Sequence, residues 1–184
     1  MQVIYELSPT EGHEWVIPDD PAGYEHVKTF IAGGRYDKKW GTMEARLEKS
    51  HGKKRPKETE IPWLGSHVLF LKQKGLDSLK DILDTNGELV PFFKCDGSQL
   101  YAFRARTIDA LKMASSELWF MPGTSRVIAI RKPDFETESI KGIDIFRAQL
   151  PDAPCTSPIY VGEKFMERFN QEKLRGLNFR KVSG

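Results

Sequence analysis

The last quarter of the chain constrains its fold more than any other part. Residues 142–182 read GIDIFRAQL, then PDAPCTSP, then IYVGEKFMERFNQEKLRGLNFRKV. Short apolar runs at 143–146 and 159–161 predict strands. Phe165, Met166 and Phe169 have helical spacing, and Leu177 and Phe179 alternate after Gly176. The order therefore predicts strand, loop, strand, helix, glycine stop and closing strand.

The remainder of the chain predicts further short strands and a few helices. Strands are expected at 2–7 and 67–71, and hairpins at 88–93 with 99–104 around Asp96-Gly97 and at 117–121 with 126–131 around 122–125. Helical spacing predicts helices at 24–32, stopped by Gly33-Gly34, and through Leu76, Leu79, Ile82 and Leu83, with a left-handed cap at Asn86-Gly87. A short helix is also expected at 42–49.

These patterns predict an α+β fold. We expect a single domain over residues 1–184, with a mostly antiparallel sheet of short strands and three to four helices. Residues 1–62 are expected to be more irregular, and residues 63–184 to form the α+β core. A chain of 184 residues can bury roughly 70% of its unfolded surface, so it needs no disulfide or metal to fold.

Composition favours a cytoplasmic protein. The chain has 28 Lys and Arg against 26 Asp and Glu, and this near balance indicates neither a nucleic-acid binder nor an acidic tail. Cys95 and Cys155 are far apart, which is typical of reduced thiols in the cytosol. No basic, apolar leader opens the chain, and its apolar runs are too short to span a bilayer. We therefore expect no membrane association.

No residue pattern predicts catalysis. His13, His26, His51 and His67 lack metal-ligand spacing. On a strand, Asp134, Glu136 and Glu138 would share one face and could hold a hard cation, although a solvated acidic edge is the favoured interpretation. Gly65-Ser66-His67 lacks the second glycine of a nucleophile elbow, because position 68 is Val. We expect a protein that is not an enzyme and needs no metal or organic cofactor.

Two segments are candidates for binding. The basic run at 53–57 could contact phosphate, but its proline and dense charge favour an exposed loop, so nucleic-acid binding is not expected. In the polar segment 35–63, Arg35, Tyr36, Trp40 and Trp63 are the residue types that dominate binding interfaces. We predict that they bind a partner, with Tyr36 and Trp40 as anchors. The competing interpretation is that these aromatic side chains cover a small hydrophobic core.

The order of several blocks carries a family resemblance. HVLFLKQKGLDSLKDIL leads into NGELVPFF, LYAFRARTIDALK follows, then IDIFR, and IYVGEKFMERFNQEKLRGLNFRKV closes the chain. Over residues 63–182 this order resembles immunity family eleven, a group of bacterial immunity proteins linked to polymorphic toxins. The resemblance implies a cytoplasmic protein that binds and neutralises a cognate toxin by occluding it.

Two other functions remain open at the level of the sequence. One is a small metal-dependent hydrolase or nuclease that uses the acidic residues at 134–138. The other is a nucleic-acid-binding module that uses the basic run at 53–57. If the chain is a toxin inhibitor, its near-neutral charge disfavours a strongly cationic toxin, whose inhibitor would be expected to be acidic.

Overall fold

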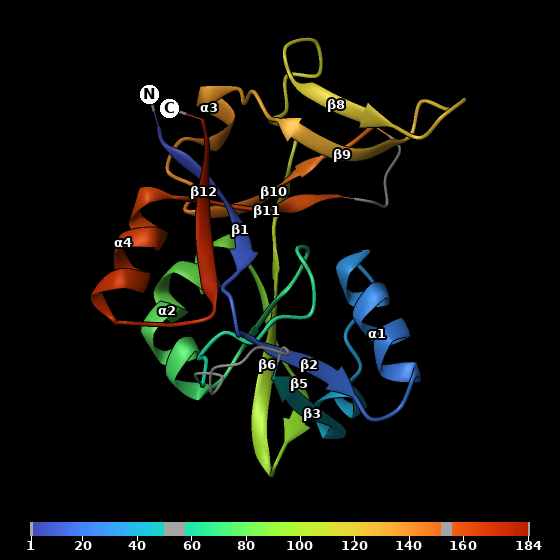
Figure 1. Ribbon diagram of the computed structural model, residues 1–184, viewed down its shortest axis with the longest axis vertical. Helices are drawn as coiled ribbons and strands as arrows, with labels where there is room; N and C mark the ends of the chain where they lie inside the picture. The colour runs from blue at the N-terminus through green and yellow to red at the C-terminus, as the bar shows by residue number, and fades with distance from the viewer. Residues whose placement is uncertain (1, 50–57, 152–155, 184) are drawn as a thin grey trace.

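Two five-stranded sheets and a separate hairpin make up the β-structure of the computed structural model, which describes residues 2–49, 58–151 and 156–183 (Figure 1). The first sheet has the order β12-β1-β11-β10-β7 and the second β2-β3-β5-β6-β4. Most neighbouring strands are antiparallel, and the exceptions are β10 with β7 and β3 with β5. The α+β fold is thereby confirmed, although the described strands form two large sheets and a two-stranded hairpin rather than one sheet.

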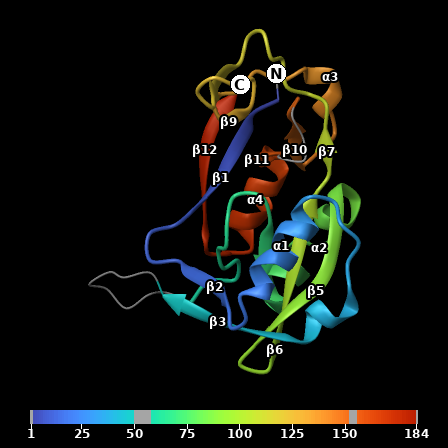
Figure 2. The same cartoon turned by 90° about the vertical axis from the view of Figure 1, so that its right-hand side faces the viewer.

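The strands of the first sheet come from both ends of the chain. They are β1 (Ile4–Pro9), β7 (Thr107–Ile108), β10 (Ile145–Gln149), β11 (Thr156–Gly162) and β12 (Leu177–Ser183). The second sheet contains β2 (Glu14–Pro18), β3 (Met43–Lys49), β4 (Leu69–Leu71), β5 (Gly87–Cys95) and β6 (Ser98–Ala105). In Figures 1 and 2, β6 runs upward from the second sheet into β7 of the first, so one stretch of chain joins both sheets.

Four α-helices accompany these strands in the described ranges: α1 (Ala22–Ile31), α2 (Gln73–Asn86), α3 (Thr137–Ile140) and α4 (Glu163–Gln171). A short 3-10 helix, η1, spans Lys38–Thr42. Figure 1 shows α1 to the right of the second sheet and α2 to its left. None of the helices in the described ranges has the length and apolar character needed to cross a membrane.

The closing helix and strand pack as predicted. Phe165 and Phe169 of α4 are buried with Leu79 and Ile82 of α2 and with Leu177 of β12, and Phe179 packs against this cluster. Apolar residues at helical spacing thus meet the alternating residues of the last strand in one core. The predicted glycine stop is wrong in detail, because α4 ends at Gln171.

Gly176 instead serves a close approach between two segments. Its φ is +122°, a conformation that side chains disfavour, and a Cβ atom there would overlap the Ile61 carbonyl oxygen. The Ile61 amide also donates to the Arg175 carbonyl oxygen at 3.2 Å. Only glycine lets the loop after α4 lie directly against the segment that includes Ile61.

Two further local predictions are corrected. Residues 43–49 form β3 and not a helix, because Met43, Ala45 and Leu47 alternate with charged residues at a period of two. Asn86-Gly87 is not a left-handed cap, since Gly87 has an extended φ of 179° and begins β5. The Asp96-Gly97 turn is confirmed, with φ values of 48° and 76° that suit a tight hairpin.

Buried Glu14 fastens the segment after residue 57 to the second sheet. It is 4% exposed, and one carboxylate oxygen, Oε2, accepts from the Thr59 amide and hydroxyl, both at 3.1 Å, and from Lys72 Nζ at 2.8 Å. Burial by itself raises the pKa of Glu14, but the Lys72 cation and the Thr59 donors outweigh it and hold the pKa below its usual value.

Glu60 makes a second carboxylate clamp, by which we mean a buried carboxylate that, like Glu14, joins separate segments through its hydrogen bonds. It accepts from the Arg175 amide at 2.9 Å and from Arg175 Nη2 at 3.0 Å, with Lys74 Nζ at 3.3 Å. Burial again opposes ionisation, and the two cations lower the pKa of the Glu60 carboxyl below its usual value. The loop after α4 and the start of α2 are both held through this one carboxylate.

Candidate functional site

The predicted anchors of the segment 35–63 lie largely in the interior. Trp40 is 6% exposed, its ring stacks on His26 at 5.1 Å between centroids, and it tilts against Phe92 at 5.3 Å. Tyr36 is half-buried at 5.7 Å from the Trp40 ring, and Arg35 is exposed. The prediction that Trp40 is a surface anchor is wrong, because its ring fills the core between α1 and the second sheet.

Trp63 is also a core residue, in a different cluster. It is 7% exposed and packs in the core that α2 and α4 cover. Its backbone amide donates to the Glu14 carbonyl oxygen at 2.7 Å, and its own carbonyl oxygen accepts from Val16 at 2.9 Å. Since Trp40 and Trp63 fill separate cores, the predicted set of four does not form one surface.

The acidic residues that suggested a cation site are dispersed over separate partners. Asp134 accepts from the Ser115 hydroxyl at 2.5 Å, Glu136 lies 3.7 Å from Lys112 Nζ, and Glu138 lies 3.7 Å from Lys141 Nζ. They share no strand face, because α3 begins at Thr137. Within the described ranges, no group of three or more histidine, cysteine, aspartate or glutamate residues is placed to hold a metal ion. The basic run at 53–57, His51 and Cys155 lie outside those ranges.

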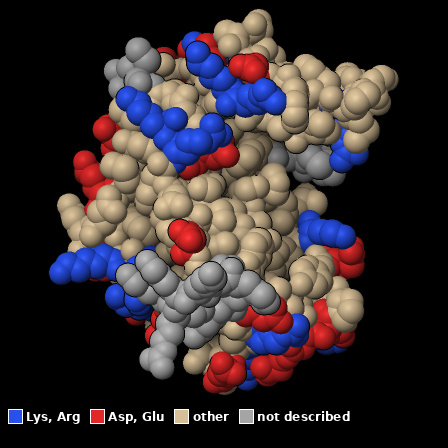
Figure 3. Space-filling view, in the orientation of Figure 1, with Lys and Arg blue, Asp and Glu red and all other residues tan. Residues whose placement is uncertain are grey.

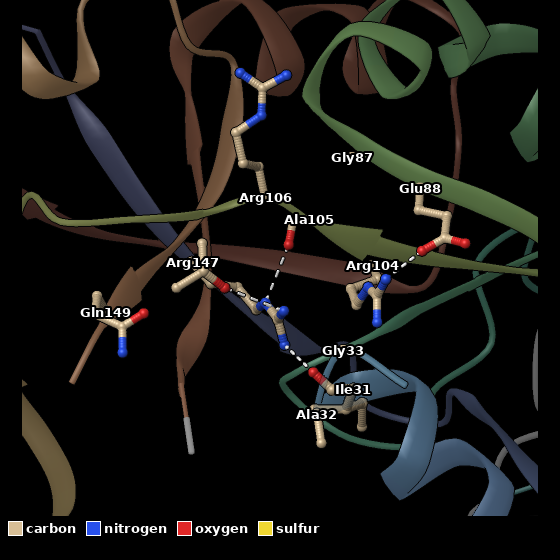
Figure 4. Close-up of a pocket in the computed structure, with 11 residues that line it drawn as sticks. Ile31, Ala32, Gly33, Gly87, Glu88, Arg104, Ala105, Arg106, Arg147 and Gln149 are labelled. Atoms are coloured by element: carbon tan, nitrogen blue, oxygen red, sulfur yellow. Dashed lines mark hydrogen bonds and ion pairs between the residues drawn. The ribbon is translucent and has the colours of Figure 1, made fainter. Parts of the chain in front are cut away.

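A cavity of about 450 Å³ lies where α1 meets both sheets, and Figure 4 shows three arginines in its lining. Arg147 is 3% exposed and donates to the carbonyl oxygens of Ala105 at 3.2 Å and Ile31 at 3.1 Å, and to the Thr107 hydroxyl at 3.2 Å. Burial, with a smaller contribution from the Arg104 charge, lowers the pKa of Arg147 to about 10. The guanidinium therefore stays charged at neutral pH.

The other two arginines also satisfy backbone carbonyls. Arg104 Nη1 donates to the Phe30 carbonyl oxygen at 2.5 Å, its Nη2 pairs with Glu88, and its guanidinium lies 4.8 Å from the Phe30 ring centroid. Arg106 points away from both in Figure 4 and donates to the Thr85 carbonyl oxygen at 3.2 Å. Arg104 and Arg147 together cap the C-terminal carbonyls of α1, where cations are favoured. These two arginines of the cavity lining therefore hold the end of α1 against both sheets.

The strongest candidate surface is the hairpin of β8 (Glu117–Phe120) and β9 (Val127–Lys132). Its inner side chains, Leu118, Val127 and Ile130, pack into a hydrophobic core that is separate from the cores containing Trp40 and Trp63. Its outer residues are large, apolar and exposed: Trp119 by 54%, Ile128 by 52%, Phe120 by 48% and Met121 by 39%. The hairpin therefore presents apolar side chains on both sides, although only one side is covered by the described residues.

A groove of about 580 Å³ runs beside the hairpin, between β9 and the C-terminal end of α1. Figure 3 shows the molecule hollowed beneath the hairpin at the right of the view, and the hairpin face seen there is mostly uncharged.

The sequence patterns predicted this hairpin but not the exposure of its apolar side chains. The signal was available, since LWFM and VIAI are uninterrupted apolar runs, longer than one buried face of a two-stranded ribbon requires.

Comparisons with known proteins leave the resemblance to immunity family eleven as a prediction. No family model matches the chain, and no curated protein matches it.

Proposed function

We propose that this protein is an immunity protein that binds a cognate bacterial toxin domain in the cytoplasm and neutralises it by occlusion, without catalysis. The observation that carries the proposal is the exposed apolar surface of the β8–β9 hairpin. The resemblance of residues 63–182 to immunity family eleven gives the class of partner.

The hairpin has the composition of an interface centre. Trp119, Phe120 and Met121 are adjacent in sequence and exposed, and aromatic residues and methionine are enriched in interfaces while tryptophan dominates hot spots. The Arg131 guanidinium lies 3.9 Å from the Trp119 ring centroid, so the exposed indole is held in place by a cation–π contact. A side chain that is ordered before binding loses less entropy when the complex forms.

Charge indicates what the partner surface presents. Between Glu117 and Lys132 the hairpin carries three cations, Arg126, Arg131 and Lys132, against the one carboxylate of Glu117. A toxin surface with an apolar centre and an acidic rim would complement it and would be steered toward it. This agrees with the expectation from the overall charge that the toxin is not strongly cationic.

Co-expression tests the proposal. The probe is the toxin domain encoded beside the gene for this chain, and the readout is survival of cells that also express a variant of the protein. We expect the wild type to protect, and Trp119→Ala to lose protection while the protein stays folded.

Trp15→Ala is the matched control. Trp15 on β2 is 36% exposed, and β2 lies in the lower half of the molecule in Figure 1, away from the hairpin at the top. We expect this variant to protect like the wild type. Wild-type protein that fails to protect, or equal loss in both variants, would contradict the proposal.

A further inference from the structure

Within the described part of the chain, the β9 strand is paired on one side only. It pairs antiparallel with β8, and no other strand in the described ranges pairs with it. In an antiparallel pair, alternate residues direct their N–H and C=O groups away from the partner strand. The outer edge of β9 therefore offers a row of backbone donors and acceptors, which is a template for another strand.

The groove runs along this unpaired edge. Five consecutive residues, 126–130, line it. Successive side chains of a strand point to opposite faces, so five consecutive residues can border one groove only where it follows the strand edge. Because β8 occupies one edge, the groove follows the other. Four of these residues, 127–130, belong to β9 and offer about 13 Å of edge, at about 3.3 Å per residue.

The opposite wall of the groove has an apolar and a polar part. Ile31 and Ala32 at the end of α1, with Leu150 and Pro158, supply the apolar part, and the polar part is supplied by Glu6, Lys28, Ser66 and Ser157. His67 also lines the groove, with Nδ1 at 3.1 Å from the Ser157 carbonyl oxygen. Burial, with a smaller contribution from the Arg147 charge, lowers the pKa of His67, so the ring is neutral at pH 7. The volume of about 580 Å³ lies in the range of roughly 300–1,000 Å³ found for ligand sites.

We propose that this groove receives an extended segment of the protein partner, added as a strand to the outer edge of β9. The inference rests on the proposed function for the existence of a protein partner, and it adds the binding mode and the chemistry. Backbone pairing supplies the affinity of such strand addition, and side-chain pockets supply the specificity. Here the incoming strand presents apolar residues to Ile31, Leu150 and Pro158, and carboxylates to the cations of the hairpin.

Charge favours such a partner over a second copy of this chain. Pairing of two β9 edges would bring Arg126, Arg131 and Lys132 of one copy close to the same cations of the other. Like charges placed opposite one another destabilise strand pairing. An acidic segment removes this repulsion and gains attraction.

A peptide experiment tests the binding mode without the toxin. The probe is a fluorescein-labelled peptide of about ten residues in which valine alternates with glutamate, long enough to cover the β9 edge. Fluorescence anisotropy is recorded with the wild type, with Ile128→Glu and with the control Trp15→Ala. Ile128→Glu puts a carboxylate beside the groove, at a side chain that is 52% exposed, so the variant is expected to fold. Circular dichroism checks that it does.

Chemical modification of the peptide tests backbone pairing separately from side-chain contacts. N-methylation of alternate residues removes the donors from one edge of the peptide and leaves its side chains unchanged. Methylation of one alternate set should abolish binding, whereas methylation of the other set should not. We expect Ile128→Glu to weaken binding of the unmodified peptide about 30-fold or more, the scale of a hot-spot residue, and Trp15→Ala to leave it unchanged.

The possible results separate this inference from the proposed function. If the peptide fails to bind, or both methylated forms bind as well as the unmodified one, strand addition to β9 is overturned. Self-association of the protein through β9, seen as a dimer in sedimentation that Ile128→Glu dissolves, would overturn it too. Binding of the toxin domain is measured separately. A toxin that binds without slowing the hydrogen exchange of β9 amides leaves the proposed function standing and refutes this binding mode.

Discussion

Two tryptophans of opposite environment give a sharp test of where binding occurs. Trp40 is 6% exposed and packs on His26 and Phe92, whereas Trp119 is 54% exposed and contacts Arg131. The same substitution, tryptophan to alanine, is therefore expected to act on stability at one site and on binding at the other.

The structure sets the size of both effects. Removal of a buried tryptophan costs about 3–5 kcal/mol, because it forfeits burial and leaves a cavity. For a domain of this size each kcal/mol lowers the Tm by about 2–4 °C, so Trp40→Ala should lower it by roughly 6–20 °C. Trp119→Ala loses chiefly a cation–π contact of about 0.5–1 kcal/mol at an exposed site, so its Tm should fall by less than about 4 °C.

Calorimetry provides both readouts. Thermal scans give the Tm, and titration with the toxin domain gives the Kd. Below its Tm, folded Trp40→Ala should bind with unchanged affinity, whereas Trp119→Ala should bind about 30-fold more weakly or worse. An unchanged Tm for Trp40→Ala, or a large fall for Trp119→Ala, would refute the assignment of the two residues. Normal affinity in Trp119→Ala would remove the hairpin from the interface.

Three further predictions concern the scaffold. Phe169→Ala, in the core between α4 and α2, should destabilise the fold by about 3–5 kcal/mol in urea unfolding, and an unchanged midpoint would mean that α4 is misplaced. Gly176→Ala should cost about 1–3 kcal/mol from its positive φ alone, whereas Gly65→Ala, which has open space at its Cβ, should be nearly neutral. The lowered pKa values of Glu14 and Glu60 contribute stability that is complete above about pH 4.3 and is lost as the pH falls through their folded values. Acid titration of the double variant Glu14→Gln, Glu60→Gln should show a shallower loss below that pH, and an identical acid limb would contradict the two clamps.

Local signals were sufficient for much of the fold. The Asp96-Gly97 turn fixes a hairpin by itself, since both residues readily adopt positive φ. The spacing of Phe165 and Phe169 identified the buried side of α4, and the alternation after Gly176 identified β12. These elements are specified by neighbours a few residues away, which is the range over which sequence patterns are informative.

The two main errors had different causes. The helix expected at 42–49 misread a local signal, because Met43, Ala45 and Leu47 already alternate at the period of a strand, and this strand pairs with β2 and β5. Trp40 was assigned to the surface because its flanking residues are polar, yet α1 and β5 enclose it. Local polarity does not report such burial, since the covering residues lie far away in sequence.

The candidate site was harder still to predict. Its groove combines β9 with residues near 31, 67 and 157, which only the tertiary fold brings together. Among the described residues β9 pairs with β8 alone, and no local pattern predicts this, because strand pairing depends on distant parts of the chain. What the sequence did contain was an excess of apolar residues in the hairpin, and that excess marks the surface on which the proposed function depends.

Titration of toxin activity tests the central claim most directly. A fixed concentration of the toxin domain is mixed with increasing amounts of the protein, and the residual toxin activity is measured. Inhibition by occlusion predicts a linear fall that ends at one equivalent, and the same end point at any incubation time. Full activity at a large excess of the protein would contradict binding, and loss of activity that grows with time at far less than one equivalent would show that the protein acts as a catalyst.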